Sequence, residues 1–261
     1  MKQNVVVPLD VKLMNGTSFA LLATFSLLAT GMVAVWALQS PLFAIQEILV
    51  LGDVTHTNAI TLRANVAPKL AGTFVTLDLA RAREIFEAVP WVRKAVVKRE
   101  FPNRLKVDLQ EHQAVAYWGS DAESRLLNSY GEVFEANVGE VEQDALPRLN
   151  GPHGQGAQVL NAYQNLEPLF AGLDLALDQF ELTGRGGWQA RLDTGAVLQL
   201  GRGSPDEVVA RTQRFVSTLA QITAKYGRLP EALESADLRH EDGYAIRLRG
   251  VTTTELVQKK K

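Results

Sequence analysis

The chain has 261 residues, with 27 Lys and Arg against 29 Asp and Glu, and a formal net charge of −2 at pH 7. This length suffices for one or two domains with their own cores. The near-neutral charge argues against nucleic-acid binding, which depends on a basic excess. The absence of cysteine excludes disulfide scaffolds, thiolate zinc sites and cysteine nucleophiles. The four histidines are too far apart in sequence to suggest a metal site, so neither a metal nor a cofactor is expected.

The first expected element is a membrane-spanning helix. No charged residue occurs between Leu13 and Gln46, and residues 19–38 are almost wholly apolar. About 20 such residues cross the ~30 Å hydrocarbon core of a lipid bilayer. A cleaved signal peptide is the alternative, because small residues flank Trp36, but the apolar region of a signal peptide spans only about 7–15 residues. We therefore expect residues 18–38 to form an uncleaved transmembrane helix.

The charges that flank this segment predict its orientation. Lys2 and Lys12 precede it, whereas no Lys or Arg follows it until Arg63. The positive-inside rule places residues 1–17 in the cytoplasm as a short tail and the remainder of the chain outside. The sequence thus predicts a single-pass type II membrane protein with a large external part.

Residues 43–112 are expected to form an α+β unit in the order strand, helix, helix, strand, strand. Asp78 is a suitable N-cap for the second helix. In the last strand Leu105, Val107 and Leu109 alternate with polar residues, which indicates one buried face. The final two strands carry a basic cluster, either a solvated face or a surface for an anionic partner. Its members are Arg93, Lys94, Lys98, Arg99, Arg104 and Lys106.

Residues 113–250 are expected to be β-rich with two helices, one over 158–171 and one beginning after Ser204. Ser204 is followed by a first-turn proline and by Glu207, which together predict a capping box. Asp242-Gly243 is expected to form a two-residue hairpin turn. Residues 251–261 resemble a flexible tail. The expected strands are 114–118, 125–127, 133–135, 180–182, 188–192, 197–200, 236–239 and 244–248.

Two glycine-rich stretches are candidate anion sites. Residues 151–156 are expected to be a linker instead, because no strand is expected before them. Residues 201–203 either hold an anion at a helix N-terminus or form a tight turn that needs flexible dihedral angles. No hydrolase nucleophile motif and no characteristic acid pair occurs, so we do not expect an enzyme.

Residues 89–112, VPWVRKAVVKREFPNRLKVDLQEH, resemble a signature of the FtsQ/DivIB family of bacterial cell-division proteins. In that family Pro-Trp-Val follows the second helix of a POTRA domain and precedes a basic strand and an alternating strand. Three further segments resemble the same family: 127–134 (LNSYGEVF), 200–203 (LGRG) and 236–248 (ADLRHEDGYAIRL). The resemblance covers the whole chain in order and implies a tail, one span, a POTRA domain over 43–112 and a β domain over 113–250.

The resemblance implies a non-catalytic inner-membrane scaffold of the divisome at the division septum. It would bind the FtsB–FtsL pair and link early to late division proteins, with FtsK and other divisome proteins as further partners. A segment of FtsB would add a strand to the end of the β domain, with Arg185 and Arg239 pairing with its acidic residues. His240 stands where the family usually has Tyr, which puts the aromatic packing in doubt or makes the interface pH-sensitive. The other implied contact residues are Leu238, Gly243, Tyr244, Ile246 and Leu248.

The residues themselves support a binding edge, because a terminal strand without a successor leaves unpaired backbone groups for β-augmentation. Alternatively, Arg247, Arg249 and the charged tail only protect this edge against aggregation. Two other functions stay open. The chain could be a POTRA-bearing chaperone or transport component for exported polypeptides, or a periplasmic cell-wall hydrolase.

Overall fold

The first element, α1 (Leu9–Leu38), is a continuous helix that begins nine residues before the expected span. Its segment Leu13–Ala37 is long and apolar enough to cross a membrane, and none of its most apolar stretch is buried within the protein. The hydroxyl groups of Thr24 and Thr30 donate to helix carbonyls four residues earlier, each at 2.8 Å. The two hydroxyl groups therefore donate their hydrogen bonds within the helix, as a polar group in a lipid environment must.

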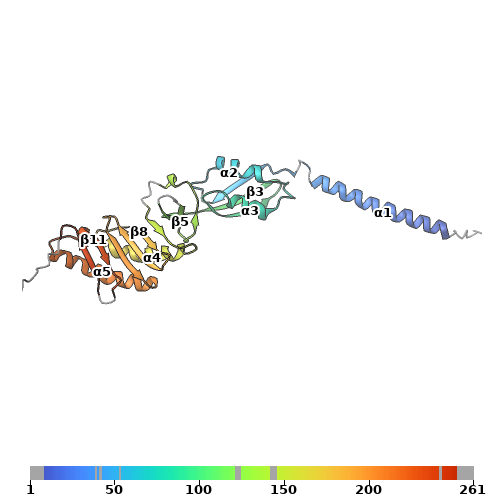
Figure 1. The fold of residues 1–261 in the computed structure, drawn as a ribbon. Coiled ribbons are helices and arrows are strands. Elements are labelled where there is room, and N and C mark those ends of the chain that lie inside the picture. Colours follow the sequence, from blue (N-terminus) through green and yellow to red (C-terminus); the bar gives the residue numbers. More distant parts are fainter. Residues whose placement is uncertain are drawn as a thin grey trace, which may run out of the picture. The chain divides into compact units, whose positions relative to one another are not determined.

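The computed structural model of the chain describes residues 9–38, 40, 43–52, 54–120, 125–141, 146–240 and 243–251. The chain divides into two units, residues 1–111 and 112–261. Figure 1 shows the elements of each unit in chain order. Of the expected C-terminal tail, only residue 251 lies within the described ranges.

The first unit contains, after α1, a strand, two helices and two strands, in the expected order. These are β1 (Glu47–Gly52), α2 (Ala59–Val66), α3 (Leu79–Glu87), β2 (Val92–Glu100) and β3 (Arg104–Glu111). β3 is the central strand, parallel to β1 and antiparallel to β2. The Asp78 carboxylate caps α3 by accepting the N–H groups of Ala80 and Arg81 at 2.8 and 3.3 Å. Leu105, Val107 and Leu109 are buried, as their alternation predicts.

A buried carboxylate connects the end of β3 to the loop before α2. Glu111 accepts the backbone N–H groups of His56 and Thr57 at 3.0 and 2.7 Å. The His56 ring stacks on Trp91, with ring centroids 3.9 Å apart. Burial raises the pKa of Glu111, but the hydrogen bonds from His56 and Thr57 outweigh burial and hold this pKa below its ordinary value. Glu111 therefore stabilises the loop as an anion.

Two residues of the basic cluster stabilise the first unit through contacts within it. Arg99 donates to the carbonyls of Phe74, Val75 and Leu77 and so holds the loop before α3. Arg104 forms an ion pair with Glu47 at 2.7 Å across the β1–β3 pair. These two contacts favour a solvated structural face over a uniform surface for an anionic partner.

In the second unit the described strands form one nine-stranded sheet in the order β12-β11-β10-β9-β8-β7-β4-β5-β6. The strand β7 was not expected, since three residues carry no periodic signal. The strands are β4 (Ala114–Trp118), β5 (Arg125–Asn128), β6 (Val133–Phe134), β7 (Arg148–Asn150), β8 (Leu177–Leu182), β9 (Gly187–Leu192), β10 (Val197–Arg202), β11 (Leu233–Asp237) and β12 (Ala245–Leu248).

Two long helices, α4 (Gly156–Ala171) and α5 (Pro205–Lys225), pack against each other and against the sheet (Figure 1). Each helix is the crossover between two neighbouring parallel strands, β7–β8 and β10–β11. The predicted capping box of α5 is confirmed, because Ser204 and Glu207 exchange side-chain to backbone hydrogen bonds. Three short 3-10 helices complete the described elements: Ala67–Lys69, Val138–Glu140 and Pro230–Ala232.

The core of the second unit lies between the sheet and the two helices. Trp188 stacks on Phe180 at a centroid separation of 5.1 Å, and its indole N–H donates to the carbonyl of Gly203 at 3.1 Å. Phe170 and Phe215 contribute the helical side and are fully buried. Because strand side chains alternate, the other sheet face is left polar.

Both glycine stretches serve chain reversals. The expectation that no strand precedes residues 151–156 was wrong, since β7 leads into them and α4 begins at Gly156. The backbone of Gly131 packs closely against the start of α4 next to this turn, where a Cβ on Gly131 would be 2.3 Å from Cα of Ala157. Gly201 and Gly203 have φ angles of +87° and +133°, which identifies residues 201–203 as a tight strand-to-helix turn.

Candidate functional site

The second unit presents an open sheet edge. β12 pairs antiparallel with β11 and is the outermost described strand of its sheet. The N–H of Arg249 donates inward to the carbonyl of Ala232 at 2.8 Å. Because successive residues of a strand turn their backbone groups to alternate sides, those of Leu248 and Ile246 face outward. Such an edge can hydrogen-bond an additional strand.

The side chains of β12 and the residue before it separate into two faces. Tyr244, Ile246 and Leu248 pack against the core of the second unit. Leu248 is buried, whereas Tyr244 and Ile246 are half-buried and retain apolar surface in water. Ala245 and Arg247 are exposed on the opposite face. The edge is therefore amphipathic, as the alternation in the sequence predicts.

Tyr244 anchors the beginning of this edge to α5. Its ring meets Phe215 edge-on, with ring centroids 5.0 Å apart and planes at 87°. Its hydroxyl group hydrogen-bonds with the hydroxyl group of Thr218. Tyr244 thus holds the start of β12 against the helical layer and offers a partner only part of its ring.

An ion pair within the chain orients Arg239. The Asp237 carboxylate accepts the Nε–H and an Nη2–H of Arg239 at 2.8 and 2.6 Å, as well as its backbone N–H at 3.0 Å. The hydrogen bond with the guanidinium lowers the pKa of Asp237 to about 2. The Arg239 side chain stays 62% exposed. Its remaining N–H groups are therefore presented to solvent in a fixed orientation.

The loop between β11 and β12 differs from the expected hairpin. Strand pairing ends at Asp237 opposite Ala245, so residues 238–244 form a longer connection and the two-residue turn was wrong. Leu238 is buried in the core, and its N–H donates to the carbonyl of Gln199 at 2.8 Å. It supports the surface and cannot present its side chain to a partner. Residues 241 and 242 lie outside the described ranges.

Four of the residues expected to bind a partner meet at one end of the sheet. Arg185 is exposed in the β8–β9 turn, immediately before the pairing of Gly187 with Arg202 at the end of β10. Arg239 lies next to that strand end, because a Cβ on Gly201 would be 3.5 Å from its Cα. The exposed His240 and Gly243 follow in the same loop.

Ile246 and Leu248 run from this end along the edge. The structure thus places Arg185, Arg239, His240 and Gly243 at the start of the edge that these two residues continue. The side chains expected to contact a partner therefore lie at one end of the sheet and along its β12 edge.

Sequence reasoning missed two residues that shape this end. Asp237 orients Arg239. An acid and a base at positions i and i+2 of an expected strand lie on the same face, so their spacing could have predicted this ion pair. Arg211 donates to the carbonyls of Leu200 and Arg202 and so closes the end of β10. The role of Arg211 could not be predicted from local sequence, because the carbonyls that it contacts lie nine and eleven residues earlier, across the tight turn.

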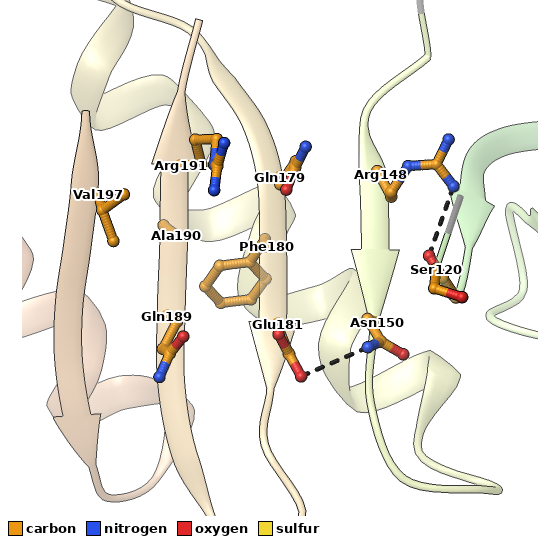
Figure 2. A pocket seen from close by; sticks show the side chains of 11 residues that line it. Ser120, Arg148, Asn150, Gln179, Phe180, Glu181, Gln189, Ala190, Arg191 and Val197 are labelled. Carbon is orange, nitrogen blue, oxygen red and sulfur yellow. Dashed lines mark hydrogen bonds between the residues drawn. The ribbon is translucent and has the colours of Figure 1, made fainter. Parts of the chain in front are cut away.

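The open sheet face has a shallow hollow of about 310 Å³ across β7, β8, β9 and β10. Figure 2 shows the polar side chains that line it. Asn150 donates to Glu181 at 3.4 Å, and Arg148 donates to the carbonyl of Gly119 at 3.4 Å. Within the described part of the chain, no cluster of three or more His, Asp or Glu could hold a metal ion. The arrangement of the second unit is suited to binding a protein segment along its edge.

Comparison with known families agrees with both units. Residues 43–112 match the family model described as POTRA domain, FtsQ-type. Residues 116–239 match the model described as cell division protein FtsQ/DivIB, C-terminal. The two matches together cover most of the part of the chain that follows α1.

Related proteins named cell division protein FtsQ align along nearly the full length of the chain. The protein from Thiomonas arsenitoxydans is 39% identical over 253 residues, which covers 94% of this chain and 90% of that protein. The protein from Burkholderia pseudomallei is 37% identical over 243 residues, covering 93% and 94%. The protein from Bordetella pertussis is 34% identical, covering 92% of each. The chain therefore belongs to the FtsQ/DivIB family of bacterial cell-division proteins.

Proposed function

We propose that this protein is a non-catalytic scaffold of the divisome that binds the external segments of FtsB and FtsL. Membership of a cell-division family supports a role in the divisome. The observation that carries the finer proposal is the open edge of β12, whose outward backbone groups at Ile246 and Leu248 can pair with a strand from FtsB. The scaffold would thereby link early to late division proteins and control assembly of the septum.

Backbone pairing supplies affinity in this mechanism, and the arginines supply orientation. A strand that adds to β12 extends the sheet and satisfies the outward backbone groups. Arg185 and Arg239 lie at the end of the sheet where β12 starts, so acidic residues of FtsB flanking the added strand can reach both. Charge-assisted pairs at this end would set the polarity and register of the added strand.

We also propose a topology for the whole chain. With α1 as a single span of the inner membrane, residues 1–17 lie in the cytoplasm and the two units lie in the periplasm at the septum. The span over 18–38 anchors the POTRA domain (43–112) and the β domain (113–250), and residues 251–261 form a tail. In this arrangement the POTRA domain contributes to localisation, with FtsK and other divisome proteins as partners. The match to an FtsQ-type POTRA model favours this role over a chaperone for exported polypeptides.

The decisive experiment measures binding of the FtsB external segment, with and without FtsL, to the full-length protein in lipid nanodiscs. We expect tight binding by the wild type and a large loss for Ile246→Pro, since proline removes an outward N–H of the edge. Val133→Pro on β6, the strand at the opposite edge, is the matched control. The bond from Asn128 N–H to the carbonyl of Glu132 implies that the N–H of Val133 also faces outward.

Val133→Pro should leave binding unchanged. Absence of binding by the wild type would overturn the FtsB proposal. An equal loss in both proline variants would show that the β12 edge is not the site. In cells, depletion of the protein should give filaments, and normal septation in its absence would contradict a role in the divisome.

A further inference from the structure

The two faces of the β12 edge differ in chemistry. Towards the helices, Tyr244 and Ile246 leave apolar surface half-exposed next to the place an added strand would occupy. Towards the open sheet face, Arg247 and Arg249 are both exposed. A strand that pairs with this edge must place alternate side chains beside each face, because strand side chains alternate.

Arg247 is the positive charge best placed to contact an added strand. Its side chain is 72% exposed and forms an ion pair with Glu234 at 3.9 Å. Glu234 is itself half-exposed, so this contact neutralises Arg247 only weakly. Arg249 is further from the middle of the edge and donates to the carbonyl of Thr194.

The backbone geometry brings the side chain of Arg247 close to any antiparallel neighbour. The N–H of Arg249 points inward, to the carbonyl of Ala232 just before β11. The register shift between the two strands places its extra residue, Glu234, on β11, so the alternation along β12 is uninterrupted and the backbone groups of Arg247 also point inward. Towards an added strand, Arg247 therefore forms a non-hydrogen-bonded pair. Facing side chains are closer in such pairs than in hydrogen-bonded ones.

We propose that the β12 edge selects a strand with alternating chemistry, carrying an acidic side chain opposite Arg247 and apolar side chains on the face of Tyr244 and Ile246. This inference rests on the proposed strand addition and specifies which segments can use it. The acidic side chain would pair with Arg247, and the apolar ones would cover the half-exposed surface beside α5. Arg247 is then a determinant of specificity in addition to the arginines at the end of the sheet.

The test uses two labelled nine-residue peptides that alternate valine and threonine and differ only in a central glutamate or lysine on the threonine face. Their affinities for the full-length protein in nanodiscs are measured by fluorescence anisotropy. We expect the glutamate peptide to bind about fivefold more tightly, as a favourable cross-strand charge pair replaces a repulsive one. Arg247→Gln should abolish this preference, and Arg247→Glu should reverse it.

Arg191→Glu is the matched control. Arg191 is exposed on the same sheet face but lies on β9, three strands from the edge, where it cannot contact an added strand. This variant should keep the wild-type order of affinities. Equal affinities of the two peptides for the wild type, failure of both to bind, or a reversal also in Arg191→Glu would each overturn the inference.

The outcome is separable from that of the proposed function. If FtsB binds and Ile246→Pro abolishes the binding while the two peptides bind equally, strand addition stands and selection by Arg247 is overturned. If FtsB does not bind but the peptides show the expected order, selection by the edge stands and its natural partner is a different alternating segment.

Discussion

Asp237 holds Arg239 by three hydrogen bonds, of which two reach the guanidinium at 2.8 and 2.6 Å and one reaches the backbone N–H at 3.0 Å. Asp237 is itself fixed by strand pairing, to Gln199 of β10 on one side and Ala245 of β12 on the other. The orientation of Arg239 is therefore set by the sheet before any partner arrives. Such preorganisation reduces the entropy that binding must remove.

Replacing Asp237 separates preorganisation from net charge. Asp237→Asn makes the site more positive, which by itself would strengthen binding of an acidic partner. Under the proposed function we expect the opposite, a loss of about twofold to tenfold in FtsB affinity. The amide cannot accept the Nη2–H bond that Oδ2 accepts and carries no charge, so it holds Arg239 less firmly. The affinities are measured by isothermal titration calorimetry with full-length protein.

Glu234→Gln is the matched control for Asp237→Asn. It removes an equal charge from the same strand but has no bond to Arg239. It should leave affinity unchanged or slightly raised. Tighter binding by Asp237→Asn would show that the carboxylate competes with the partner for Arg239 instead of positioning this arginine.

Glu111 should be important for the stability of the POTRA domain. Glu111→Gln loses the charge that accepts two backbone N–H groups in a buried place, and we expect a cost of about 1.5–3 kcal/mol. Glu47→Gln removes a half-exposed ion pair in the same sheet and should cost less than about 1 kcal/mol. Urea titration followed by hydrogen exchange of residues 47–111 measures both variants. Equal costs would mean that the bonds to the loop before α2 contribute little.

The pKa of Glu111 also predicts a pH dependence. The folded-state pKa lies below the ordinary value of 4.5, so the ionised group stabilises the domain at higher pH. This contribution is lost as the pH falls below about 4.5 and through the lowered folded value. The stability difference between wild type and Glu111→Gln, followed from pH 7 to pH 3, should therefore shrink only at the acidic end. A difference that is constant over this range would contradict the assignment.

Two glycines with similar dihedral angles distinguish backbone strain from close packing. Gly131 and Gly154 have φ angles of +76° and +79°. A Cβ on Gly154 meets nothing within 4 Å, whereas one on Gly131 would be 2.3 Å from Cα of Ala157 at the start of α4. We expect Gly154→Ala to cost about 1 kcal/mol from strain alone. Gly131→Ala should cost about 2–4 kcal/mol, since overpacking adds to the strain. Thermal unfolding of the two variants measures the difference, and equal costs would rule out the packing contact.

Elements that depend on local interactions could be predicted from the sequence. The apolar run of α1, the Asp78 cap and the Ser204–Glu207 capping box each involve residues within a few positions of one another. The alternation of Leu105, Val107 and Leu109 likewise indicates a half-buried strand without knowledge of its neighbours. The motifs of the FtsQ/DivIB family carried the identity of the chain in the same way.

Only the tertiary structure decided the form of the candidate site. β7 has three residues, too few for periodicity, and it becomes a strand because β4 and β8 pair with it. Leu238 is buried beside β10, where its N–H donates to the carbonyl of Gln199, almost forty residues earlier in the chain. Likewise, Glu111 finds its hydrogen-bond donors more than fifty residues away.

The sequence by itself thus determined the apolar helix α1, the order of elements in the first unit and the family, because local periodicity, caps and motifs encode them. The sequence also indicated the terminal strand as the edge and the alternation of its side chains. The tertiary structure decided which backbone groups of β12 face outward and that Leu238 is buried in the core. Strand pairing joins segments that are distant in the chain, and no local pattern records which backbone groups of a strand this pairing uses.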